Sequence, residues 1–305
     1  MFIVLIASCS KSSLRISDKE KVNFKWTCIN VNQRIQGDAH YIELENGENI
    51  LIDAGYKEEG TLTLIPLFKK NNITKIDHFF LSHYHVDHYS GLIELLEQKF
   101  IIKNFYSAPI SDEKCASEPW GCNVKDVNKL KNLLAENKVK QVEIKSGMNF
   151  QWGKINLKIL YANNGIAPPD GAIDINGMSI VMQFTDGKIK YLFTGDLDEK
   201  VGSFLANQGD FDMESDILKI PHHGADAHPP KEFFEKVKAK DYIVPATKDL
   251  WCSERDKVMR KYVLLNKITT YISGHTKNIT IASDGEKWTI TPENKKPLQC
   301  SELVK

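Results

Sequence analysis

Three histidines and an aspartate stand within six residues, directly after a short apolar segment. The stretch 81–88 reads Leu-Ser-His-Tyr-His-Val-Asp-His, residues 76–81 are suited to a β-strand, and 90–97 have a helical pattern. A strand ending in this way places several side chains on one loop. Imidazole is the commonest metal ligand, and a carboxylate among imidazoles suits a hard or borderline divalent ion. The stretch therefore predicts a metal site formed by His83, His85, Asp87 and His88.

The composition allows a large core and sets no strong preference for a partner. The chain has 305 residues, of which 42% are hydrophobic and 26% charged, and its 40 basic residues balance 40 acidic ones. A zero formal net charge gives no general attraction to nucleic acid or to an anionic membrane, although a local patch could exist. No run of about 18 apolar residues is present, so we expect no transmembrane helix.

The pattern along the chain indicates one α/β domain with two packed sheets flanked by helices. Residues 24–53 read as a β meander with a hairpin signal at Asn46-Gly47. We expect helices at 62–71 and 126–138, and strands at 76–81, 101–106, 141–145, 155–161, 178–185, 189–193, 216–220 and 268–272. The expected domain runs over 22–292, followed by a C-terminal tail at 293–305.

Two further strands end in residues that could bind a metal. Tyr191-Leu192-Phe193 leads into Thr194-Gly195-Asp196, and the strand from 216 leads into Pro221-His222-His223-Gly224. Alone, Thr-Gly-Asp is only a turn. Among the other histidines, we expect His78 to pack inside its strand, His40 to bind no metal, and His275 to be a weaker candidate for the cleft.

These motifs together resemble the metallo-β-lactamase-fold hydrolases. H-x-H-x-D-H at 83–88, Gly37-Asp38-Ala39, Asp53-Ala54-Gly55, the Thr-Gly-Asp turn and the Pro-His-His-Gly turn look most like the hydrolase domain of ComEC-type competence proteins and their free-standing relatives. The resemblance covers roughly residues 24–290. It implies a four-layer αββα sandwich in a single domain.

The resemblance also implies a ligand set for one or two divalent ions. Asp196 would bridge them, with His83 and His85 on the first ion and Asp87, His88 and His222 on the second. His223 would face the substrate or protonate the leaving group, although the two adjacent histidines could be exchanged. Most of the superfamily has a further histidine ligand between the first motif and the bridging aspartate, and this chain has none there. Asn176 or water would complete that site. We expect zinc, with manganese as the alternative.

The implied activity is hydrolysis by a metal-activated hydroxide, with Asp87 orienting the nucleophile. The first expectation is a phosphodiesterase or nuclease that acts on a phosphodiester or another small hydrolysable substrate, with nucleic acid as a candidate. The alternatives are an ester, lactone or thioester hydrolase, and an envelope-anchored metal-binding protein without turnover.

The N-terminus suggests export. Residues 1–8 are apolar, and Cys9 with the following Ser-Lys-Ser-Ser resembles a bacterial lipoprotein box. We therefore expect a lipoprotein signal and a polar tether at 1–21, a place in the cell envelope, and membrane contact only through a lipidated Cys9. The alternative is an apolar terminus or first strand of a cytoplasmic protein. Cys115 and Cys122 could form a disulfide if the protein is exported.

Overall fold

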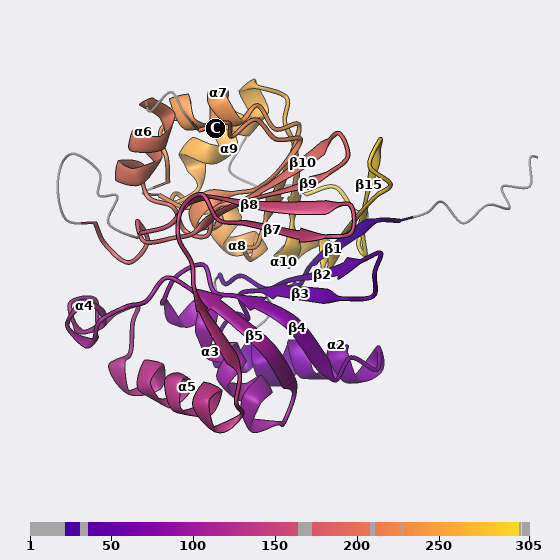
Figure 1. Ribbon diagram of the computed structural model, residues 1–305. Coiled ribbons are helices and arrows are strands. Elements are labelled where there is room, and N and C mark those ends of the chain that lie inside the picture. The colour runs from indigo at the N-terminus through magenta and orange to yellow at the C-terminus, as the bar shows by residue number, and fades with distance from the viewer. Residues whose placement is uncertain are drawn as a thin grey trace, which may run out of the picture.

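Two β-sheets pack face to face, and helices cover the outer face of each (Figure 1). The computed structural model describes residues 22–30, 36–163, 173–207, 211–226, 228–298 and 300. This is the expected αββα arrangement. The expected lipoprotein segment at 1–21, including Cys9, lies outside the described residues. Among the described residues, no helix has the length and apolar character needed to span a membrane.

The larger sheet has eight strands and gathers both ends of the described chain. Its order is β15-β14-β1-β2-β3-β4-β5-β6. The strands are β1 (Phe24–Cys28), β2 (His40–Leu44), β3 (Asn49–Ile52), β4 (Lys75–Phe80), β5 (Ile101–Ser107), β6 (Lys140–Glu143), β14 (Ile279–Ser283) and β15 (Trp288–Pro292). The sequence analysis did not identify β14 and β15; β14 pairs with β1 and β15 pairs with β14, so the two strands extend the meander.

The smaller sheet has seven strands in the order β13-β12-β11-β10-β9-β8-β7. They are β7 (Asn149–Trp152), β8 (Ile155–Tyr161), β9 (Val181–Asp186), β10 (Ile189–Phe193), β11 (Ile217–Lys219), β12 (Asp241–Val244) and β13 (Thr269–Ile272). β10 to β13 run parallel to one another. Parallel strands need crossover connections, and helices supply them here.

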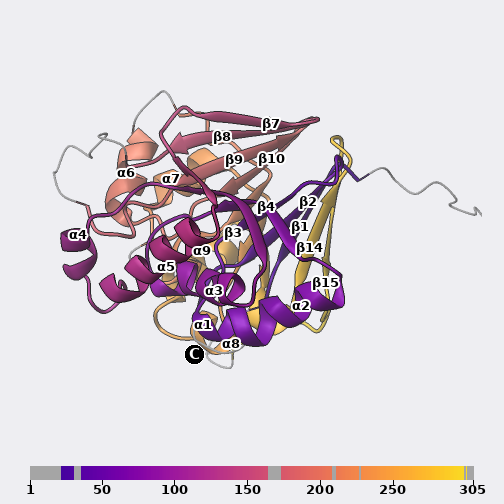
Figure 2. The same ribbon diagram turned by 60° about the horizontal axis from the view of Figure 1, so that its bottom comes forward.

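The helices form the outer layers. Turning the molecule shows α2, α3 and α5 on the outer face of the larger sheet (Figure 2). These layers and connections contain α1 (Lys57–Glu59), a π-helical turn (Gly60–Leu64), α2 (Ile65–Lys70), α3 (Val86–Glu97), α4 (Asp112–Ala116), α5 (Val124–Glu136), α6 (Glu199–Asn207), a 3-10 turn (Pro221–Gly224), α7 (Lys231–Val237), α8 (Lys248–Trp251), α9 (Lys257–Leu265) and α10 (Ser273–Thr276).

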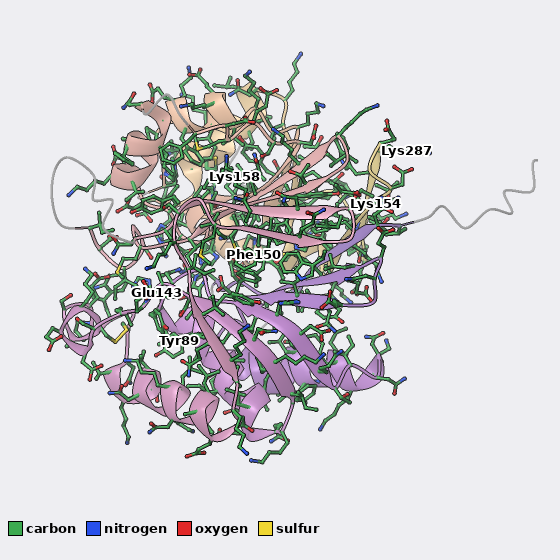
Figure 3. The ribbon with its side chains drawn as sticks, in the orientation of Figure 1. Tyr89, Glu143, Phe150, Lys154, Lys158 and Lys287 are labelled. Carbon is green, nitrogen blue, oxygen red and sulfur yellow. A yellow bond between two sulfur atoms is a disulfide. The ribbon has the colours of Figure 1, made fainter. Side chains whose placement is uncertain are left out.

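The central core lies between the two sheets and is rich in aromatic side chains. Trp26 of β1 packs on Phe193 of β10, with ring centroids 4.5 Å apart. Phe150, seen between the sheets in Figure 3, contacts Phe80 of the opposite sheet. β4 is buried along nearly all of its length because this core covers one face and the helices cover the other. The sheets are therefore rigid supports for the loops at their ends.

Candidate metal centre

Four strand ends meet at one edge of the two sheets and carry the site. β3 and β4 are parallel neighbours in one sheet, and β10 and β11 are parallel neighbours in the other. The carboxyl ends of parallel strands lie at the same edge, which is the usual position of sites in open α/β sheets. β4 leads into the histidine loop, and α3 begins at once, so that Asp87 and His88 belong to its first turn.

Two aspartates and two histidines from three of these loops converge on one point. Nε2 of His88 lies 3.2 Å from Oδ2 of Asp196, and Nε2 of His223 lies 3.1 Å from the same oxygen. Nε2 of His223 is also 3.4 Å from Oδ2 of Asp87. The four ligand atoms lie within 4.8 Å of one another, and all four residues are buried. Two imidazoles and two carboxylates suit a divalent transition metal.

Several polar atoms that face this point make no hydrogen bond within the described structure, although Oδ1 of Asp196 lies 3.5 Å from the Lys219 ammonium. Nε2 of His83, His88 and His223 and Oδ1 of Asp196 are buried and have no hydrogen-bond partner. Buried polar groups are normally hydrogen-bonded, so several orphaned ligand atoms around one point need an explanation. A bound cation provides one, and we conclude that these residues fit a metal.

Two buried aspartates orient the histidines from behind. Oδ2 of Asp53 accepts a hydrogen bond from Nδ1 of His88 at 2.8 Å, and its carboxylate also accepts from the Ser82 hydroxyl and backbone N–H. On the other side, Nδ1 of His223 lies 3.3 Å from Oδ1 of Asp38 and 3.1 Å from the Pro245 carbonyl oxygen. A proton held on Nδ1 leaves the Nε2 lone pair facing the metal, which is how outer partners usually fix a metal-binding histidine.

Electrostatics in the cluster favour a cation. Burial raises the pKa of Asp196, but the charges of His223 and His88 outweigh this and hold that pKa well below its ordinary value. Burial lowers the pKa of His88, whereas Asp196, Asp87 and Asp53 raise it well above the usual histidine value. A metal that binds His88 must displace its proton, so metal binding here releases protons.

Lys219 is a fully buried cation at the back of the same cluster. Its ammonium group donates to the Gly195 carbonyl oxygen at 2.7 Å and lies 2.5 Å from Oδ2 of Asp38 and 3.5 Å from Oδ1 of Asp196. Burial lowers the pKa of Lys219, but the two aspartates outweigh burial and raise it above its ordinary value. Lys219 therefore carries a permanent positive charge beside the expected bridging aspartate.

The structure separates the two adjacent histidines. Residues 222, 223 and 224 have φ values of 49°, 57° and 89°, so the chain reverses sharply there. His223 points into the cluster, whereas His222 is only partly buried and its Nδ1 bonds to the Asp226 carbonyl oxygen at 2.7 Å. These distances argue against the expected roles, in which His222 binds the metal and His223 faces the substrate. They favour His223 as the ligand and leave His222 outside the cluster.

The other expected ligands lie beside this cluster. Nε2 of His83 is 4.0 Å from Oδ2 of Asp196, and the rings of His83 and His85 are 4.8 Å apart. Nε2 of His85 lies 3.3 Å from Oε2 of Glu118. Asn176 is buried and its Oδ1 has no hydrogen-bond partner, so it remains a candidate to complete the His83 and His85 side.

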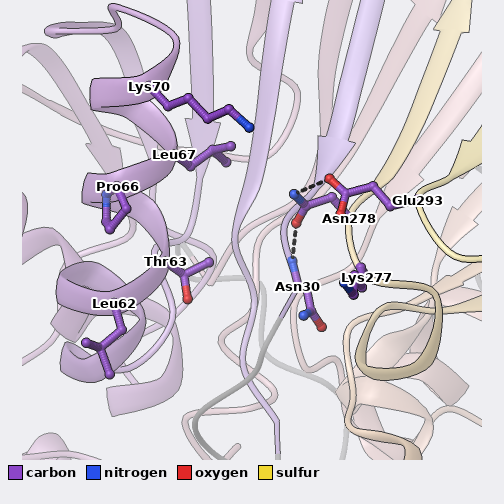
Figure 4. A pocket seen from close by; sticks show the side chains of 9 residues that line it. All are labelled: Asn30, Leu62, Thr63, Pro66, Leu67, Lys70, Lys277, Asn278 and Glu293. Carbon is purple, nitrogen blue, oxygen red and sulfur yellow. Dashed lines mark hydrogen bonds between the residues drawn. The ribbon is translucent and has the colours of Figure 1, made fainter.

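The remaining histidines lie elsewhere. His78 packs in the core, where its ring nitrogens contact Tyr106 and Trp152. Nε2 of His40 is 3.7 Å from Asp38, behind the cluster. His275 bonds to the Lys296 carbonyl oxygen and does not join the cluster. None of the clustered residues lines the surface pocket between α2 and the segment around Asn278 (Figure 4).

The sequence analysis did not assign four residues to the site, namely Asp38, Asp53, Glu118 and Lys219. Asp38 and Asp53 belong to quoted motifs but were assigned to the fold and not to the site. Lys219 sits in an apolar strand, and a lysine with three buried neighbours is itself a signal, because lysine is almost never fully buried unless it is paired.

Comparison with known proteins finds relatives of the metallo-beta-lactamase superfamily and structures of the same fold. The model of the metallo-beta-lactamase superfamily matches residues 33–144. ComE operon protein 3 of Bacillus subtilis (strain 168) is 27% identical over 230 residues, which cover 70% of this chain but only 27% of that protein. The chain thus spans about a quarter of the length of this relative.

Solved structures show the same fold at low identity. YhfI from Bacillus subtilis, described as a metallo-beta-lactamase fold protein, has a TM-score of 0.54 and 15% identity, covering 85% of this chain and 99% of YhfI. CmlA from Streptomyces venezuelae, described as a diiron β-hydroxylase, has a TM-score of 0.55 and 12% identity, covering 86% of this chain and 54% of CmlA. At these identities the likeness concerns the fold alone.

Proposed function

We propose that this chain, which resembles proteins of the metallo-β-lactamase superfamily in sequence and fold, is a metal-dependent hydrolase that cleaves a phosphodiester with two divalent ions. The observation that carries this proposal is the set of buried, unpartnered ligand atoms of His83, His88, His223 and Asp196 around one point. The resemblance to the competence-type hydrolase domain favours a phosphodiester over a carboxylic ester.

The charge of the site gives a second argument. Four buried aspartates, Asp38, Asp53, Asp87 and Asp196, face one buried ammonium, that of Lys219. With neutral histidines, one divalent ion leaves this group negative, and only two make it positive. An anionic phosphodiester needs a positive site, so the substrate class and the number of ions are linked. A single ion would favour a neutral ester or lactone.

The residues then have distinct roles. A bound metal would lower the pKa of a coordinated water and polarise the scissile group. Asp196 and His223 would hold the ions together with His83, His85, Asp87 and His88, and Asp87 would also orient the nucleophile. We assign no proton donation to His222, because its Nδ1 donates to a carbonyl oxygen and burial lowers its pKa, which keeps it neutral. Zinc is the first candidate metal and manganese the second.

The test measures metal content and the hydrolysis of bis-p-nitrophenyl phosphate and p-nitrophenyl acetate by the full chain. Asp196→Asn should lose metal and phosphodiester turnover together. Asp212→Asn is the matched control, because this carboxylate is exposed and its partners, Lys190 and the Glu214 N–H, lie away from the metal centre. One ion per chain with turnover of the acetate alone would replace the proposal with an ester hydrolase. Bound metal without turnover of either substrate would leave a metal-binding protein.

We also propose that the protein works in an oxidising compartment, as a lipidated Cys9 would require. Disulfides join Cys115 to Cys122 and Cys252 to Cys300, while Cys28 is the described cysteine without one. Disulfides persist in exported proteins and are rare in the cytosol. Thiol titration of the denatured, non-reduced protein from its native host should find at most Cys9 and Cys28 reactive. Six reactive thiols before reduction would refute export.

A further inference from the structure

A short loop closed by a disulfide lies against the His85 side of the metal centre. It runs from Cys115 to Cys122, whose sulfur atoms are bonded, and it follows α4. The loop is attached to the site through its own backbone as well, since the carbonyl oxygen of Gly121 accepts a hydrogen bond from the N–H of Val86. The disulfide therefore constrains the shape of the loop, and the backbone hydrogen bond fixes its position relative to the site.

Glu118 ties the loop to the expected ligand His85. One carboxylate oxygen approaches Nε2 of His85, and the other accepts from the Lys114 ammonium and the Ile175 N–H, each at 2.9 Å. The Glu118 carboxylate is therefore held from three sides.

Gly121 lets the loop backbone touch the imidazole directly. A Cβ atom at this position would lie 2.8 Å from two atoms of the His85 ring, closer than real Cβ atoms come to their neighbours. A larger residue would push the loop away from the site. The neighbouring residue, Trp120, is consequently carried to the edge of the metal centre.

Trp120 is the exception among the tryptophans of this chain. The residue is 71% exposed, whereas Trp26, Trp152 and Trp251 are buried and Trp288 is only partly exposed. Its ring centroid nevertheless lies only 4.9 Å from that of His85. The Trp120 ring is exposed on a constrained loop, so it contributes little to the core. It can instead contact a molecule bound at the metals through one of its faces.

We propose that Trp120 is a specificity-determining residue that stacks on a planar aromatic group of the substrate, such as a nucleobase next to the scissile phosphate. This inference rests on the proposed phosphodiesterase function and narrows its substrate class to nucleotide-type phosphodiesters. Bases stack on aromatic side chains with little sequence preference, because every base has a π-face. The phosphate would be held by the metals and the base by Trp120.

The experiment compares AMP with ribose 5-phosphate, which has the phosphate but lacks the base. Isothermal titration calorimetry on the metal-loaded full chain should show tighter binding of AMP by about 5- to 150-fold, the range expected for one stacked base. Trp120→Ala should abolish this difference, and Trp120→Phe should keep most of it. Leu265→Ala removes a similarly exposed apolar side chain on α9 and should change nothing.

Two results would overturn the inference, namely equal affinity for both compounds in the wild type, or an AMP advantage that survives in Trp120→Ala. These readings need no turnover, so they separate this inference from the proposed reaction. If the wild type turned over no phosphodiester but kept the Trp120-dependent preference for AMP, the proposed hydrolysis would be refuted and base recognition would stand. In steady-state assays of a nucleotide phosphodiester, Trp120→Ala should raise KM and leave kcat nearly unchanged.

Discussion

The ammonium nitrogen of Lys219 lies 2.5 Å from Oδ2 of Asp38, and both side chains are excluded from solvent. The strands and loops that carry them belong to different sheets, so this ion pair joins the two halves of the sandwich behind the metal centre. Breaking a buried pair by removing one partner leaves an uncompensated charge.

Lys219→Met should therefore lower the free energy of unfolding of the metal-free protein by about 3–5 kcal/mol. Denaturant titration in the presence of a chelator measures this. Lys238→Met is the control, since Lys238 pairs with Glu214 at the surface, and a loss of no more than about 0.5 kcal/mol is expected there. A loss at Lys219 as small as that of the control would show that the pair is not important for stability.

Replacement of the two adjacent histidines should have unequal effects on metal binding. Nε2 of His223 faces Asp196 and Asp87, whereas His222 is held by the Asp226 carbonyl oxygen outside the cluster. We expect His223→Ala to lose more metal affinity than the roughly 10–100-fold typical of outer partners, and His222→Ala to keep the wild-type value. Competition with a chromogenic chelator measures both. The reverse result would restore His222 as the ligand.

Asp53→Asn should weaken metal binding without unfolding the protein. Asp53 has a φ of 56°, a conformation that asparagine tolerates, so the backbone is preserved while the charge behind His88 is lost. Because Asp53 fixes the His88 tautomer, we expect metal affinity to fall about 10–100-fold. The melting temperature of the metal-free form checks the fold. An unchanged affinity would show that the Ser82 hydroxyl alone orients His88.

The buried carboxyl of Asp256 should make stability depend on pH. Both of its oxygens lack a hydrogen-bond partner, and burial raises its pKa to about 7 against the opposing charges of His223, Arg255 and Arg260. The unfolded pKa is about 3.9, so the folded state binds more protons between these values. The stability associated with the protonated carboxyl is complete below about pH 4 and is lost as the pH rises through about 7.

Asp256→Asn removes this ionisation. Its gain in melting temperature over the wild type should be larger at pH 8 than at pH 5. In a protein of this size, about 1 kcal/mol of stability corresponds to roughly 2–4 °C. Differential scanning fluorimetry of the metal-free protein at both values is sufficient. For Asp212→Asn, the change in stability relative to the wild type should be the same at the two pH values to within about 0.5 kcal/mol, because the Asp212 carboxylate is exposed. A gain independent of pH would contradict a raised pKa.

The sequence by itself determined the fold class and the position of the metal centre. His83, His85, Asp87 and His88 come from a single junction between a strand and a helix, so their proximity is a local property that survives without tertiary information. The apolar strand before Thr-Gly-Asp places the Asp196 carboxylate at a strand end, and the family resemblance then gave this residue its metal role. The same logic placed the Pro-His-His-Gly turn at the site.

Only the tertiary structure decided which groups contact and orient the ligand side chains on the side away from the metal. The choice between His222 and His223 depends on three consecutive left-handed residues, and no periodicity in the sequence encodes them. The apolar neighbours of Lys219 in its strand hint at burial, but the sequence does not name its partners, because Asp38 and Asp196 arrive from distant segments to compensate its charge. Such pairings depend on the packing of one sheet on the other. A pattern within one segment records its own local geometry, but the partner that offsets a buried charge comes from elsewhere in the chain.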